Sequence, residues 1–409
     1  MSTTHPTTHT DDAAALPTFP GVRDARCPFD PPAEHTGWRE REGLQRAMLH
    51  GEPVWMVSRF ADIREALNDP RISADSTRPG FPQAQVGSGE MPRAFPRMDD
   101  PEHARLRRML TGDFTVKRME QLRPKIQEVV DGILDEMISQ GQPADLVRGY
   151  AYPVPSVMIS LLLGVPYSDH EFFQHHSETL ISHGAAPEEK GVAIMALFQY
   201  LMELVARKEK DPTDDIISRL VHERVATGEI DRETVVMNAL TILFAGHETT
   251  ANMIGLSTLT LLRNPDKLAR IRDTDDPALI ANTVEELLRY LTIPQDVVLR
   301  VASEDITVGG QLVRAGEALL MNMPAGNRDG AFFDRPDEFD IDRNTRGHLA
   351  FGYGIHQCLG QALARVELQI ALPTLLRRLP GLRLAVPMEQ VMFRTDLSTY
   401  GVRELPIAW

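Results

Sequence analysis

The chain has 409 residues, of which 42% are hydrophobic and 25% are charged, a composition that excludes collagen, coiled coil and wholesale disorder for its body. Forty-three basic against 58 acidic side chains leave a net charge of −15, which argues against nucleic-acid binding because phosphate recognition needs a positive surface. The two cysteines, Cys27 and Cys358, cannot form a disulfide framework, so we expect a reducing compartment, the cytoplasm.

The amino-terminal segment carries no targeting signal. Residues 1–20 are rich in Thr, His, Asp and Pro, with neither a basic start nor an apolar core, and they predict a disordered lead-in. One domain is expected over residues 21–409. The most apolar long stretch, 235–262, is interrupted by His247, Glu248 and other polar side chains. It favours a helix through the centre of the protein over a membrane span, so no membrane association is expected.

The elements of the first third are predicted as a strand at 53–57, a helix at 60–68, a long loop at 71–98, a helix from Asp100 through Leu110 and a helix at 116–139. Loops of such length inside enzymes are often functional. Asp100 is expected to cap its helix, with Pro101 at the first helical position. Gly141 is expected to end the last of these helices.

Most of the segment 145–290 also predicts helices, which prolines punctuate. After residue 300 the pattern changes to short strands. Residues 306–308 and 311–313 flank Gly309 and Gly310, which indicates a hairpin with a two-residue turn. A further strand is expected at 318–323, irregular chain at 324–357 and a helix at 358–379. The predicted fold class is therefore mainly α with small β-sheets (α+β).

The strongest chemical signal is the segment FGYGIHQCLG, from Phe351 to Gly360. Two glycines allow a tight backbone path before Cys358, which is predicted to open a helix. Backbone N–H groups at such a position stabilise a thiolate, and a thiolate can bind iron. A structural cysteine at a glycine-rich turn is the alternative. Cys27 has none of this context and is expected to be a packing residue.

This segment resembles the haem-binding loop of the cytochrome P450 family, with Phe, two Gly, a basic residue, Cys and Gly in the expected order. The resemblance extends from about residue 20 to the end and implies the cytochrome P450 fold, with a long central helix over a haem b whose iron Cys358 binds. It further implies propionate contacts from His103, Arg107, Arg300 and His356. Other expected haem neighbours are Gly246, Ala350, Phe351, Gly352, Gly360 and Ala364.

Two helical motifs gain meaning from the resemblance. Glu286 and Arg289 share a helix face. This spacing alone is usual for a solvated surface pair, but it is similar to the family's buried structural pair, to which Arg343 would add. In 245–250, an acid and two hydroxyls interrupt an apolar helix, where burial without partners is costly. Hydroxyls can bond the preceding turn instead. The resemblance implies that Glu248 relays protons and that Thr249 steadies the reacting oxygen.

The segment from His103 to Lys125 contains seven Lys and Arg but only two acids, a local charge of +5 in an acidic chain. It is either a solvated helix face or a docking patch for an acidic electron donor. With His103 and Arg107 expected to point inward, the outward candidates are Arg105, Arg108, Lys117 and Arg118.

The resemblance implies a haem-thiolate monooxygenase that inserts one atom of O2 into a C–H bond of an apolar small molecule: a secondary metabolite, steroid, macrolide or xenobiotic. Ferredoxin and its reductase are the expected electron donors, because the chain shows no nucleotide-binding fingerprint. Coupling, epoxidation or dealkylation on the same fold, and a haem protein without turnover, stay open. The substrate residues implied are Thr241, Phe244, Ala245, Val297 and Leu397, beside the loop at 71–98, residues 165–200 and residues 293–298.

Overall fold

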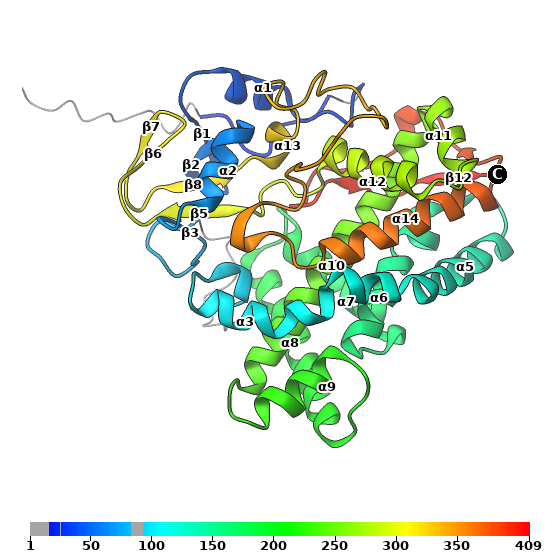
Figure 1. Cartoon of the computed structure of the whole chain (residues 1–409), viewed down its shortest axis with the longest axis horizontal. Coiled ribbons are helices and arrows are strands. Elements are labelled where there is room, and N and C mark those ends of the chain that lie inside the picture. The colour runs from blue at the N-terminus through cyan, green and yellow to red at the C-terminus, as the bar shows by residue number, and fades with distance from the viewer. Residues whose placement is uncertain (1–15, 25, 83–92) are drawn as a thin grey trace, which may run out of the picture.

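The computed structural model describes residues 16–24, 26–82 and 93–409. A small β part lies on one side of the molecule and a larger helical part on the other (Figure 1). Residues 1–15, most of the predicted lead-in, lie outside the described residues, as do residues 83–92 of the predicted loop. Phe19 is buried and its N–H donates to the carbonyl of Met48 at 2.8 Å. Contacts with the body of the protein therefore begin within the stretch that the sequence assigns to the lead-in.

The helices of the described residues are α1 (Ala33–Glu40), α2 (Phe60–Asn68), α3 (Glu102–Thr111), α4 (Val116–Gln121), α5 (Arg123–Ser139), α6 (Pro153–Leu163), α7 (His170–Ile181), α8 (Pro187–Lys210), α9 (Ile216–Leu220), α10 (Arg232–Leu262), α11 (Pro265–Arg272), α12 (Pro277–Leu291), α13 (Met323–Gly326) and α14 (Gln361–Arg378). The strands are β1 (Gln45–Leu49), β2 (Glu52–Val57), β3 (Ile72–Ser73), β4 (Ala144–Asp145), β5 (Leu299–Ala302), β6 (Ile306–Val308), β7 (Gln311–Val313), β8 (Ala318–Met321), β9 (Arg383–Leu384), β10 (Phe393–Arg394), β11 (Gly401–Val402) and β12 (Pro406–Ala408).

The main sheet has the strand order β1-β2-β8-β5-β3, in which β2 and β8 are parallel and the other neighbours are antiparallel. The hairpin β6–β7 pairs Val308 with Gln311, as predicted. Gly309 and Gly310 form its turn with φ angles of 55° and 82°. Such positive angles at both central residues define the tight hairpin turn that glycine favours.

Helix α10 runs through the centre of the helical part (Figure 1). It has 31 residues that are buried on nearly every side, and it contacts α6, α8 and α14. Its length and uniform apolarity follow from this position, because a helix covered on all faces needs no polar side. None of the helices within the described ranges is long and apolar enough to cross a membrane.

Two of the helices predicted in the first third of the chain have wrong boundaries. The helix predicted from Asp100 begins at Glu102, although the Asp100 carboxylate accepts a hydrogen bond from the Ala104 N–H at 3.1 Å. The helix predicted at 116–139 is two helices, α4 and α5, which meet at Leu122. Pro124 explains the break, since it has no N–H to continue the hydrogen-bond ladder. Gly141 follows α5 with a φ of 86°, as expected of a C-terminal glycine.

A buried ion-pair network fixes the chain that leads into the cysteine loop. Arg289 donates to both oxygens of Glu286 at 2.7 and 2.8 Å, and both side chains are fully buried. Arg343 adds a contact to Glu286 at 3.3 Å. Arg289 also donates to the carbonyls of Asn327 and Pro336. The network ties α12 to the irregular segment after α13, as the sequence predicts.

Candidate active site

A cavity of about 360 Å³ lies between the middle of α10 and the cysteine loop with the start of α14. Thr241, Ala245 and Thr249 line it from α10, while Phe351, Cys358 and Gly360 line it from the loop. Ala245 is exposed although it lies in the centre of a buried helix, because it faces this cavity. The sequence-predicted loop and the sequence-predicted central helix are thus opposite walls of one space.

The cysteine loop is closed by short-range backbone contacts. The Cys358 N–H donates to the carbonyl of Phe351 at 2.8 Å, and Gly352 and Gly354 have φ angles of 72° and 73°. A Cβ on Gly354 would lie 2.7 Å from the carbonyl oxygen of Leu67. Both glycines therefore serve the tight path that the sequence predicts.

Cys358 does not open a helix, which corrects the sequence prediction. Helix α14 begins at Gln361, three positions later, with Gly360 as its N-cap. Burial raises the pKa of the Cys358 thiol, while the N–H groups of Gly360 and Gln361 and the Arg107 and Arg365 guanidinium groups act in the opposite direction. Coordination to a metal ion deprotonates a thiol outright, and these groups then hold the thiolate charge.

A group of basic side chains gathers at one edge of the cavity. Arg97, Arg107, Arg300 and His356 line it. His103 is buried behind them, and its ring centroid lies 4.0 Å from that of His356. Burial, then the neighbouring cations with Arg300 first, lower the pKa of His356 to about 3. Burial and the charge of Arg97 likewise lower the pKa of Arg300 to about 10.

These basic groups fit the haem that the sequence resemblance implies. Buried nitrogens of Arg97 (Nη1), His103 (Nε2) and His356 (Nδ1) have no hydrogen-bond partner in the described part of the chain. Neighbouring guanidinium groups that repel one another favour a bound anion, and carboxylates pair strongly with unused N–H donors of this kind. Two propionates on one side and an iron ion facing Cys358 would satisfy this arrangement.

The other residues that the resemblance gives as haem neighbours lie around the same cavity. Ala350, Phe351, Gly352, Gly360, Ala364 and Gly246 all line the cavity. Gly246 also has a packing role, because a Cβ there would lie 2.8 Å from Cδ1 of Ile159 on α6. Arg107 reaches past the cavity and donates to the carbonyl of Gln357, next to Cys358.

Glu248 and Thr249, which are adjacent on α10, have different surroundings. The hydroxyl of Thr249 lines the cavity and donates to the carbonyl of Ala245 at 2.8 Å. Glu248 does not line it. Its carboxylate is buried and accepts hydrogen bonds from the Tyr152 hydroxyl at 2.7 Å and from Arg394 at 3.2 Å. Arg394 in turn pairs with Glu178 on α7.

The predicted substrate residues divide in a similar way. Thr241, Ala245 and Val297 line the cavity, whereas Phe244 and Leu397 are not among its lining residues. Leu397 is buried and forms a bridge with Ser182 after α7. Phe95 and Ile293, from the expected ranges 71–98 and 293–298, also line the cavity, whereas no residue of 165–200 does, which corrects that prediction. The sequence analysis missed several apolar lining residues, which are Leu67, Ile159, Met253 and Leu288.

Two ionisable lining residues were not singled out by the sequence analysis. Arg97 belongs to the loop predicted at 71–98, and the only signal for it is its place beside Phe95 and Pro96 in an otherwise small-residue stretch. Glu367 of α14 is fully buried at the cavity floor with an unpartnered Oε1, and burial raises its pKa to about 8. No motif in the sequence marks it.

Comparison with known proteins places this site in a family. A model of the cytochrome P450 family matches residues 42–381. Cytochrome P450-SU2 from Streptomyces griseolus is 52% identical over 396 residues, covering 96% of this chain and 97% of that protein. A vitamin D3 dihydroxylase from the same organism is 44% identical over 100% of both chains.

The fold agrees with these matches. The crystal structure of the mycinamicin VIII C21 methyl hydroxylase MycCI from Micromonospora griseorubida, bound to mycinamicin VIII, superposes with a TM-score of 0.90 at 40% identity. The superposition covers 96% of this chain and 100% of that one. With the cysteine loop facing a central helix across one cavity, these matches show that the chain belongs to the cytochrome P450 family of haem-thiolate monooxygenases.

Proposed function

We propose that this enzyme inserts one atom of O2 into a C–H bond of an apolar small molecule, with haem held by Cys358 and the basic side chains at the cavity edge. The observation that carries the proposal is the position of the Cys358 side chain, which faces Ala245 and Thr249 across one cavity. When bound through a thiolate, haem supplies the electron push for O–O cleavage and the oxidising chemistry.

On the Cys358 side of the cavity, neighbouring groups would position the thiolate and compensate its charge. The Gly360 and Gln361 N–H groups and the Arg107 side chain act on the Cys358 sulfur. Arg97, Arg107, Arg300, His103 and His356 would hold the two propionates. The unpartnered nitrogens among them support this role.

On the α10 side, small side chains leave space and polar ones manage protons. Ala245 and Gly246 line the cavity without filling it. Thr249 lines the cavity, and rotation of its hydroxyl away from the Ala245 carbonyl would free it to donate a hydrogen bond into the cavity. Glu248, one residue before it, would supply protons from its buried pair with Tyr152 and Arg394.

The substrate class follows from the cavity wall and from the relatives. Phe95, Ile159, Leu288, Ile293 and Val297 present an apolar surface, which selects for shape and apolarity rather than for charge. The relatives include a vitamin D3 dihydroxylase and a mycinamicin hydroxylase. We therefore propose hydroxylation of a polycyclic or macrocyclic secondary metabolite.

Labelled dioxygen tests the reaction directly. A panel of steroids and macrolides is incubated with the haem-loaded enzyme, a ferredoxin, its reductase and NADPH. The masses of the products are then measured by mass spectrometry. We expect one labelled oxygen atom per product. Substrates that give absorption shifts on binding, but no NADPH-dependent product from any redox pair, would contradict the proposal and favour a haem protein without turnover.

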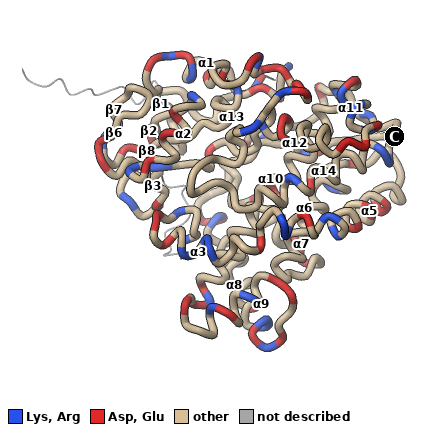
Figure 2. The backbone as a smooth tube through the Cα atoms, in the orientation of Figure 1, with Lys and Arg blue, Asp and Glu red and all other residues tan. Residues whose placement is uncertain are grey.

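The electron donor would dock on the basic segment α3–α4. Arg105, Arg108, Lys117 and Arg118 are all exposed. Figure 2 marks Lys and Arg positions in blue on the backbone of α3. Val116 is 68% exposed among them, an apolar contact of the kind found at interfaces. Arg107, on the same helix, touches the cysteine loop. These features support an acidic ferredoxin as the partner.

Charge reversal separates this docking site from a solvated face. Arg108→Glu and Lys117→Glu should slow reduction by ferredoxin at low salt, and the difference from wild type should shrink as ionic strength rises. Peroxide-driven turnover, which needs no ferredoxin, should be unchanged. Arg383→Glu, at an exposed position far along the chain, is the control. Equal ferredoxin-supported rates in all variants at low salt would contradict the docking site.

A further inference from the structure

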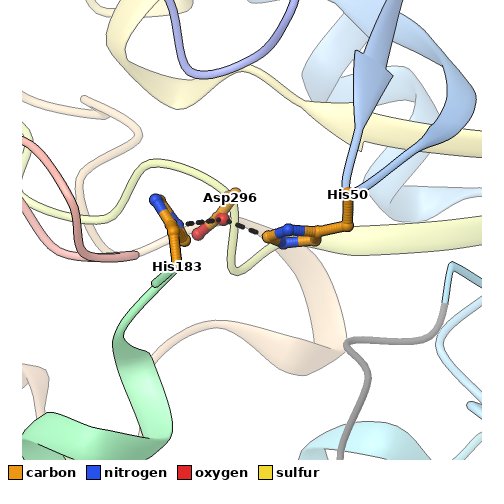
Figure 3. Close-up of side chains that lie close together, drawn as sticks. All are labelled: His50, His183 and Asp296. Atoms are coloured by element: carbon orange, nitrogen blue, oxygen red, sulfur yellow. Dashed lines mark hydrogen bonds and ion pairs between the residues drawn. The ribbon is translucent and has the colours of Figure 1, made fainter. Parts of the chain in front are cut away.

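Three segments that are distant in sequence bring two imidazoles and one carboxylate together outside the active site. His50 lies in the turn between β1 and β2, His183 lies two residues after α7, and Asp296 lies between α12 and β5. Figure 3 shows both rings directed at the carboxylate, which stands between them. Their potential ligand atoms all lie within 4.8 Å of one another.

We propose that His50, His183 and Asp296 bind a divalent transition-metal ion of the zinc class. A ring nitrogen of each histidine and one carboxylate oxygen would supply three ligands, and water would complete a tetrahedral site.

The distances suit this ion. His183 Nε2 lies 3.0 Å from Asp296 Oδ2, and His50 Nε2 lies 3.5 Å from the same oxygen. Zinc bonds of about 2.0–2.1 Å at tetrahedral angles place neighbouring ligand atoms about 3.3 Å apart. Two of the three ligand pairs therefore already have the spacing that the ion requires. A small rotation of the ring of His50, whose side chain is 30% exposed, would bring in the third.

The carboxylate of Asp296 is buried, and the two imidazoles contact only one of its oxygens. Asp296 is only 4% exposed, and its Oδ1 has no hydrogen-bond partner among the described residues. Burial opposes its charge, yet the hydrogen bonds from His183 and His50 hold the pKa of Asp296 well below its ordinary range. A cation at the centre of the cluster would compensate this charge and use the remaining oxygen.

The ligand types also select the class of ion. Calcium takes six to eight oxygen ligands and magnesium keeps several waters around carboxylates, whereas imidazoles suit zinc and its neighbours. Arg97 and Lys190 also interact electrostatically with the carboxylate of Asp296. Two imidazoles and one carboxylate therefore favour zinc or a neighbouring ion over calcium or magnesium.

The backbone holds the ligands ready for binding. The His183 N–H donates to the carbonyl of Asp396 at 2.8 Å, and the Gln295 N–H donates to the carbonyl of Ser398 at 3.0 Å. His183 and the residue before Asp296 are thus both held by backbone hydrogen bonds to the segment 396–398. His50 is presented by a hairpin turn in which its φ is 51° and that of Gly51 is 87°.

The position of the site suggests what the ion would do. Pro294 and Val297 flank Asp296 and line the large cavity. An ion bound here would link the β1–β2 turn and the segment after α7 to the segment 294–297, which lines the cavity. We therefore expect zinc to raise the melting temperature of the haem-loaded enzyme.

Zinc binding to the tag-free haem-loaded enzyme tests the proposal by calorimetry, with X-ray absorption at the zinc edge reporting the ligands. We expect one zinc per chain, bound to two imidazoles and oxygen donors. His183→Ala and His50→Asn should each weaken binding at least tenfold. Asn suits the positive φ of the turn, so His50→Asn decides the question even if His183→Ala fails to fold.

The control replaces a histidine pair that has no part in the cluster. His175→Ala/His176→Ala removes two neighbouring rings on α7, whose centroids lie 5.2 Å apart, and it should bind zinc as the wild type does. Absence of zinc binding to the wild type, or equal affinity in the wild type and His50→Asn, would overturn the proposal. Neither result depends on whether the enzyme turns over substrate.

Discussion

The carboxylate of Glu248 lies 3.2 Å from the guanidinium of Arg394, inside the protein and away from the cavity lining. The Tyr152 hydroxyl donates to the same carboxylate oxygen at 2.7 Å, and the other oxygen lies 3.8 Å from His247. A buried acid directly before Thr249 is thereby held in place by Tyr152, which directly precedes α6, and by Arg394 of β10. To deliver a proton to the cavity, the carboxyl group of Glu248 has to leave its contacts with Tyr152 and Arg394.

Loss of Arg394 should destabilise the enzyme more than loss of Tyr152. Arg394→Leu leaves a buried charge without its partner, which costs about 3–5 kcal/mol. Tyr152→Phe removes one hydrogen bond, with a cost of about 1–3 kcal/mol. Urea unfolding of the haem-loaded variants measures both, with Arg383→Leu as the exposed control. The account is contradicted if Arg394→Leu is no less stable than Arg383→Leu.

Thr249→Ala should separate electron use from product formation. The hydroxyl is bonded to the helix backbone at rest, so we expect a change in unfolding free energy below about 1 kcal/mol. Product per NADPH should fall and peroxide should rise. The matched control is Thr258→Ala, which removes the same kind of backbone hydrogen bond, here to Ile254 at 2.9 Å, on the same helix but away from the cavity. Equal coupling in both variants would argue against a role for Thr249.

Arg97→Leu should weaken haem retention. Its buried guanidinium has an unused nitrogen at the cavity edge, and a charge-assisted hydrogen bond contributes about 1.5–3 kcal/mol. Haem transfer to apomyoglobin should therefore become about 10–100-fold faster. The control is Arg105→Leu, at an exposed position on α3. Identical transfer rates in the two variants would show that Arg97 holds no propionate.

Glu285 should make the cysteine loop sensitive to acid. It accepts hydrogen bonds from His348, before the loop, at 3.0 Å and from Arg365, after it, at 2.6 and 3.0 Å. Burial alone would raise the pKa of Glu285, but these hydrogen bonds lower it from 4.5 to about 2. A lowered pKa adds stability above the unfolded-state pKa, and this stability is lost as pH falls toward the folded-state value.

The measurement compares the wild type with Glu285→Gln by urea unfolding across pH. The wild type should be more stable by on the order of 2 kcal/mol at neutral pH. The difference should stay constant down to about pH 5 and shrink at lower pH. A difference that grows with acid would have the wrong sign and would contradict the assigned partners.

The sequence predicts best what depends on local pattern. The helix at 60–68 matches α2, and the hairpin at 306–313 has its glycine turn. Helical periodicity and glycines that allow positive φ angles can both be recognised from neighbouring residues. The strand β1 was missed and the start of α14 was misplaced by three residues. In both cases the boundary depends on pairing partners or loop closure rather than on local propensity.

The site was predictable only where a motif marks it. Cys358 and Thr249 stand in recognisable segments, and both line the cavity. Arg97 and the pairing of Glu248 with Arg394 were not foreseen, because a loop arginine has no pattern and the pair joins residues 146 positions apart. The carboxylate that meets His50 and His183 is likewise assembled by tertiary contacts alone.

The central claim is that the Cys358 thiolate binds the haem iron. The most direct test is the absorption spectrum of the reduced carbon monoxide complex in the wild type, Cys358→Ala and Cys27→Ala. We predict the band for which the family is named in the wild type and in Cys27→Ala, and its complete loss in Cys358→Ala. A band that survives in Cys358→Ala, or that disappears in Cys27→Ala, would contradict the account.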